Sequence, residues 1–90
     1  MSKKLYETIT AENWTHFSPH LEDVHRGAGC LHAHLIWAQG NGEVKARRRR
    51  LVEETIAVLY PDRATTISAF NDHPDTTVED VIRVCKVADV

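Results

Sequence analysis

The sequence predicts an all-α fold, a compact bundle of about four helices with a short helical turn before the last helix. Three observations lead to this prediction. Apolar residues recur at three- and four-residue spacings in several segments, helix-capping residues stand before some of these segments, and all three prolines lie between them. The chain has 90 residues, of which 42% are hydrophobic. We therefore expect one domain over residues 1–90, with a modest core.

The first helix is predicted over residues 2–14. Leu5 and Ile9 are four positions apart and would lie on one face of this helix. Trp14, at its end, is expected to contribute to the core. Residues 15–29 then contain one proline, two glycines and no sustained period, which predicts a long loop.

The second helix is predicted within residues 29–38. Leu31, Leu35 and Ala38 follow the i, i+4, i+7 spacing of a single helical face. Trp37 flanks this face and is expected in the core. The glycine-containing sequence QGNG that follows would end the helix.

The third helix is predicted over residues 42–60. Asn41 can cap its start, and Pro61 ends it because proline disfavours a helical conformation in the residue before it. One stripe of side chains is expected to face the core. This stripe consists of Leu51, Val52, Thr55, Ile56, Val58 and Leu59.

A single helical turn over residues 67–71 is predicted to close at Asn71 and Asp72. Such side chains bond nearby backbone amides, so we assign both residues a structural role in the turn. The last helix opens with a predicted capping box between Thr76 and Glu79. Its apolar face comprises Val78, Val81, Ile82 and Cys85.

The formal net charge is −2, but the charges are unevenly distributed. Five of the eleven basic residues form what we call the basic segment, and the remaining chain carries six bases against thirteen acids. The basic segment consists of Lys45, Arg47, Arg48, Arg49 and Arg50, and the opposing acidic segment of Asp72, Asp75, Glu79 and Asp80. A surface with two poles favours oriented association, including association with a second copy.

Cys30, His32 and His34 occupy alternate positions, which on a strand would place three metal-binding groups on one side. On a helix, Cys30 and His34 share a face while His32 lies about 200° away. We therefore predict no metal and no cofactor. The alternative is a zinc site built from Cys30, His34 and a histidine of the preceding loop, with His25 as the third ligand or else His16 or His20.

The same spacing of Cys30 and His34 raises the possibility of a thiolate nucleophile, since an imidazole can lower the pKa of a nearby thiol. No oxyanion site or oriented base accompanies the pair, so we predict that the protein is not an enzyme. Cys30 and Cys85 are expected to be buried reduced thiols, with a disulfide as the alternative. The sequence contains no apolar run of membrane-spanning length, so a cytoplasmic protein is predicted.

The chain combines a tryptophan, a cysteine-led helix, an arginine-bearing helix and the segment ISAFNDHPDTTVEDVIRV. This combination resembles a small family of uncharacterised helical domains in bacteria and their phages. Phe70, Asn71 and Asp72 stand where family members carry a motif similar to Trp-Asn-Asp. The family's Cys-x-x-Gly-Ala-Leu pattern corresponds to CLHAHL, with alanine and histidine in place of glycine and alanine. The resemblance implies a helical fold and a bacterial or phage setting, but no mechanism.

The basic segment indicates the function class. Successive helical residues point about 100° apart, and Arg49 and Arg50 can form weak pairs with Glu53 and Glu54. Arginine also binds carboxylates in a bidentate manner. We predict a protein-interaction module that binds an acidic protein surface through the four arginines. A nucleic-acid-binding accessory protein is the alternative, disfavoured by the excess of acids, and a Cys/His metal site or thiol enzyme is the third reading.

Overall fold

The structure is a computed structural model that describes residues 4–16 and 29–90. The helices within this part of the chain are α1 (Leu5–Thr8), α3 (Leu31–Trp37), α4 (Gly42–Leu59), α5 (Ile67–Asp72) and α6 (Val78–Ala88). These residues form no strand, and their one β-type contact is an isolated bridge between Trp14 and Gly29. The predicted all-α fold, with a short helix before the last one, is confirmed.

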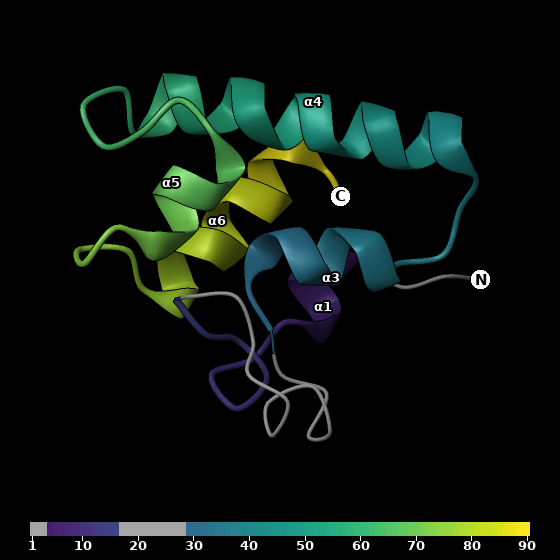
Figure 1. The fold of residues 1–90 in the computed structure, drawn as a ribbon, viewed down its shortest axis with the longest axis horizontal. Coiled ribbons are helices and arrows are strands. Elements are labelled where there is room, and N and C mark those ends of the chain that lie inside the picture. The colour runs from purple at the N-terminus through teal and green to yellow at the C-terminus, as the bar shows by residue number, and fades with distance from the viewer. Residues whose placement is uncertain (1–3, 17–28) are drawn as a thin grey trace.

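The helices pack around one core of buried side chains, and Figure 1 shows how they are arranged. The long helix α4 lies along one side of the molecule, and α3, α5 and α6 pack against it, while α1 packs against α6. Every helix contributes buried apolar side chains. Among them are Leu5, Leu31, Leu35, Val52, Ile56, Ile67, Phe70, Val81, Val84 and Cys85.

Helix α4 begins and ends as predicted. The Asn41 side chain accepts a hydrogen bond from Val44 N at 2.9 Å, and the helix ends at Leu59, shortly before Pro61. The predicted inward stripe is wrong at Val58, which is 76% exposed. Val58 follows the buried Ile56 by two positions, or about 200° around the helix, so it points away from the core.

Helix α1 is much shorter than the predicted helix over residues 2–14. The side chain of Asn13 accepts a hydrogen bond from Thr10 N and donates one to Thr8 O, both at 2.8 Å. These bonds close a turn, because an asparagine side chain competes with the helix for backbone groups. Trp14 therefore lies outside the helix, although it still packs against the core.

Helix α3 has Cys30 as its N-cap residue and buries its Leu31 face as predicted. The prediction of a core position for Trp37 is wrong, since this residue is 47% exposed. Its ring meets His34 edge to face and lies over Gly29. A Cβ atom at Gly29 would approach the ring to 2.8 Å, so this packing requires a glycine.

The predicted capping box of α6 is wrong by one position. Thr77 accepts a hydrogen bond from Asp80 N, and Asp80 accepts one from Thr77 N. The sequence allows either position, because Glu79 follows Thr76 by three residues and Asp80 follows Thr77 by three. Thr76 is only 1% exposed, and its hydroxyl accepts a hydrogen bond from Arg63 at 3.4 Å. Thr77 is therefore the residue that caps the start of α6.

Candidate functional site

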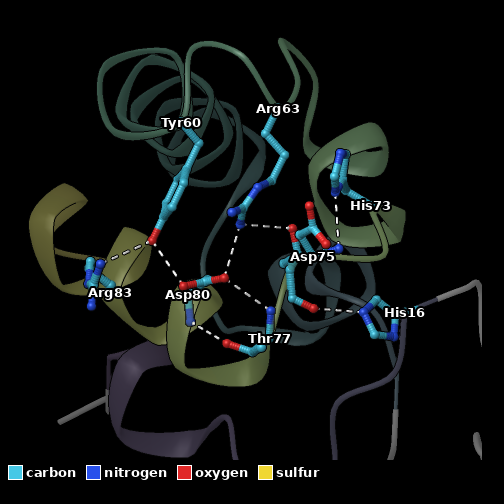
Figure 2. Close-up of polar contacts among 9 residues, drawn as sticks. His16, Tyr60, Arg63, His73, Asp75, Thr77, Asp80 and Arg83 are labelled. Carbon is cyan, nitrogen blue, oxygen red and sulfur yellow. Dashed lines mark hydrogen bonds and ion pairs between the residues drawn. The ribbon is translucent and has the colours of Figure 1, made fainter.

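A cluster of polar side chains joins the end of α4 to the start of α6 (Figure 2). Arg63 Nη1 lies 3.0 Å from Asp80 Oδ2, and the Tyr60 hydroxyl donates to Asp80 Oδ1 at 3.2 Å. Arg63 also lies over the Tyr60 ring, 4.6 Å from its centroid. Arg83 donates to the Tyr60 hydroxyl oxygen at 3.4 Å. These contacts hold the segment that follows α4 against α6.

The electrostatics of this cluster favour one protonation state. Burial alone would raise the pKa of Asp80, but hydrogen bonds from the Thr77 amide, the Arg63 guanidinium and the Tyr60 hydroxyl outweigh it and lower the pKa. Burial and the Asp80 carboxylate raise the pKa of Tyr60. At neutral pH Asp80 is therefore ionised and Tyr60 protonated. This arrangement stabilises the contact between the segment that follows α4 and the start of α6.

A second polar group is centred on Asn71, which is 1% exposed. Its Oδ1 atom accepts hydrogen bonds from Trp14 Nε1 at 2.6 Å and from Leu31 N at 2.9 Å. Its amide nitrogen donates to Thr15 O at 3.0 Å and to His16 O. The side chain thus reaches well beyond its own turn and joins α5 to α3 and to the segment after α1. Asp72, the second predicted turn residue, contacts the Asn71 amide at 3.2 Å.

The five residues of the basic segment fall into two groups. Lys45 Nζ donates to Ile36 O at 2.7 Å, and Arg48 Nη1 donates to Gln39 O at 2.5 Å. Carbonyls at the end of a helix lack helical partners, so these two side chains stabilise the end of α3 and the connection to α4. The other three are Arg47, Arg49 and Arg50, and all three are exposed.

The exposed arginines make no ion pair within residues 4–16 and 29–90. The pairs of Arg49 with Glu53 and of Arg50 with Glu54, which the spacing allows, are therefore not formed. An exposed pair of this kind contributes at most about 0.5 kcal/mol, too little to hold two long side chains in place.

The Cys30 to His34 segment is arranged as a helix start. Cys30 is half-buried, and the predicted burial of its thiol holds fully only for Cys85. His34 is buried, and its Nε2 donates to Asn13 O at 2.8 Å. Burial lowers the pKa of His34, more than the hydrogen bond to Asn13 raises it.

In the described part of the chain, no three His, Cys, Asp or Glu residues are grouped closely enough to hold a metal ion. His16 Nε2 instead donates to Thr76 O at 2.7 Å. His20 and His25, the other alternative ligands, lie outside the described residues. Both free cysteines, Cys30 and Cys85, are thiols rather than a disulfide.

Sequence reasoning missed two features of these sites. The Arg63–Asp80 pair spans 17 positions, and no local spacing signals it. The burial of His34 did have a signal, since it follows Leu31 by three positions on the apolar face of the helix.

The fold and these sites define a small all-α domain with a basic helix and a buried asparagine that links three segments. The chain belongs to a family of unknown function, DUF6197, which it matches over residues 4–89. No curated protein and no solved structure matches the chain significantly. Among the described residues, every helix is too short or too polar to cross a membrane.

Proposed function

We propose that this protein is a small interaction module that binds an acidic protein surface through α4. One observation carries the proposal. Arg47, Arg49 and Arg50 are exposed and make no ion pair within the described residues, while the other two bases of the segment bind backbone carbonyls. The three arginines are thus available to a partner.

The position of these arginines supports the same proposal. They lie close together in the first half of α4, after its first turn, and concentrate positive charge on that part of the helix. An acidic partner would neutralise this charge and add bidentate contacts. A second copy could supply the acids, because Asp75 and Glu79 are exposed. Asp80 already forms an ion pair with Arg63 and is therefore less available to the arginines of a second copy.

The proposed setting is the cytoplasm of a bacterium or of a phage-infected cell. Two free cysteines are consistent with a reducing compartment. Nucleic acid remains the competing partner, because arginines also bind phosphates. The overall charge of −2 disfavours it, since the acids outside the basic segment would repel the phosphates.

The test replaces Arg47, Arg49 and Arg50 together by Gln. Circular dichroism should show unchanged helix content, while partner capture from a bacterial lysate and any self-association seen by light scattering should be lost. The matched control replaces Glu43, Glu53 and Glu54 by Gln on the same helix. This control should keep or strengthen capture, because it removes negative charge.

Two results would contradict the proposal. If the arginine variant captures partners and assembles as the unmodified protein does, the arginines form only a solvated face. If the unmodified protein is retained on DNA in a salt-dependent manner and the arginine variant is not, nucleic acid is the partner class.

A further inference from the structure

A cleft of about 300 Å³ lies beside the basic segment, where α4 meets the end of α3, the start of α1 and the residues after α6. Apolar side chains, including Leu5, Val44 and Leu51, line it. Its volume is at the lower end of the range for ligand pockets, roughly 300–1,000 Å³. The space therefore fits one bulky apolar side chain better than a large cofactor.

Charged groups surround this apolar lining. The cleft is lined by three cationic side chains, those of Lys4, Arg47 and Arg48. Among its lining residues Asp89 is the one with an acidic side chain. Lys4 lies 3.5 Å from Asp89, and Arg48 donates to Gln39 O, so both have partners. Arg47 has none within the described residues. The cleft thus combines an apolar wall with an excess of positive charge, and the Arg47 guanidinium forms no ion pair within the described residues.

We infer that this cleft binds an acidic peptide segment. One bulky apolar side chain, flanked in the peptide by carboxylates, would insert into the cleft. The inference rests on the proposed function and specifies the partner of the same surface. The excess of positive charge favours an acidic segment. The apolar lining can bury an apolar side chain, which the carboxylates of that segment cannot replace. An apolar anchor in a pocket, next to arginine, is a common source of binding energy at protein interfaces.

The inference predicts a dependence on the peptide that simple charge attraction lacks. Burying a leucine side chain should strengthen binding roughly tenfold or more. Attraction between exposed charges would instead be insensitive to the central residue and would weaken with salt. The apolar contribution should persist at high salt.

The experiment titrates ¹⁵N-labelled protein with two capped polyglutamate peptides, one with a central leucine and one with a central serine. We expect the leucine peptide to bind roughly tenfold or more tightly than the serine peptide. Amide shifts should concentrate at Leu5, Val44 and Leu51. Arg47→Gln should weaken binding of the leucine peptide, whereas Arg50→Gln, an equal change of charge outside the cleft, should have a smaller effect.

The outcomes separate this inference from the proposed function. Equal binding of the two peptides, or shifts located away from the cleft, would overturn the cleft inference. If that equal binding is also abolished by the triple arginine variant, the acidic-surface proposal stands without the cleft. If neither peptide binds, the cleft inference is also overturned, and partner capture alone decides the proposed function.

Discussion

Trp14 Nε1 donates a hydrogen bond to Asn71 Oδ1 across 2.6 Å, although the two residues are 57 positions apart. The same oxygen accepts from Leu31 N, so one amide group connects the segment after α1, the start of α3 and the end of α5. In the described residues every buried side-chain nitrogen or oxygen has a hydrogen-bond partner. That one asparagine therefore links these three segments by hydrogen bonds.

Replacement of Asn71 by Ala should therefore be strongly destabilising. It leaves the Trp14 and Leu31 N–H groups without their acceptor and the Thr15 carbonyl without its donor. Unsatisfied buried groups cost about 1–3 kcal/mol each, so the free energy of unfolding should fall by at least about 2 kcal/mol. Urea denaturation measures the change. Ser68→Ala, at an exposed position of the same helix, should have little effect, and an equal loss in both variants would contradict this role.

Asp80→Ala should also destabilise the fold, by about 2 kcal/mol, because it removes both the capping box and the partner of Arg63. Asp80→Asn should cost less, since its amide oxygen can still accept from Thr77 N. Because the pKa of Asp80 is lowered below its ordinary 3.8, its stabilisation is present above that pH and is lost as the pH falls through its folded-state pKa. Thermal unfolding at a series of pH values would show this, with the exposed Glu79→Ala as the control.

His34 should make the protein less stable in mild acid. Its pKa is lowered below the ordinary 6.5 by burial, so the unfolded chain binds a proton more readily than the folded one. Stability should then be constant above about pH 6.5 and fall as the pH drops below it, by at most about 1.4 kcal/mol per pH unit. Chemical denaturation between neutral and mildly acidic pH measures the slope. His34→Gln should flatten it, and a slope left unchanged by this substitution would contradict the role of His34.

The two thiols should differ in reactivity. Burial raises the pKa of Cys85 to about 12, so its thiolate is scarce and inaccessible in the folded state. Cys30 is half-buried at the start of α3 and should react first with a thiol reagent. Labelling of Cys30→Ser and Cys85→Ser variants, followed by mass spectrometry, separates the two rates. Rapid native labelling of Cys85 would show that the core opens readily.

Much of the secondary structure could be predicted because its causes are local. Asn41 caps α4, Pro61 follows its end, and Leu31 and Leu35 share a buried face. Each of these features depends on residues within one or two helical turns, where spacing and side-chain type decide the conformation.

Other features depend on contacts that sequence spacing does not encode. Two threonines fit the capping pattern of α6 equally well, and burial of Thr76 against Arg63 decides in favour of Thr77. Five neighbouring bases look equivalent in the sequence, yet only two of them bind backbone carbonyls, Lys45 that of Ile36 in α3 and Arg48 that of Gln39 after α3.

By itself, then, the sequence determined the helical class, the approximate limits of α3, α4 and α5, and the concentration of positive charge, because these follow from local spacing and composition. Only the tertiary structure decided which polar groups form hydrogen bonds or ion pairs within the fold. Asn71 and Asp80 bind partners far away in the chain, whereas Arg47 remains exposed beside a cleft. Such long-range pairings arise only when the helices pack, since packing brings distant donors and acceptors within hydrogen-bonding distance.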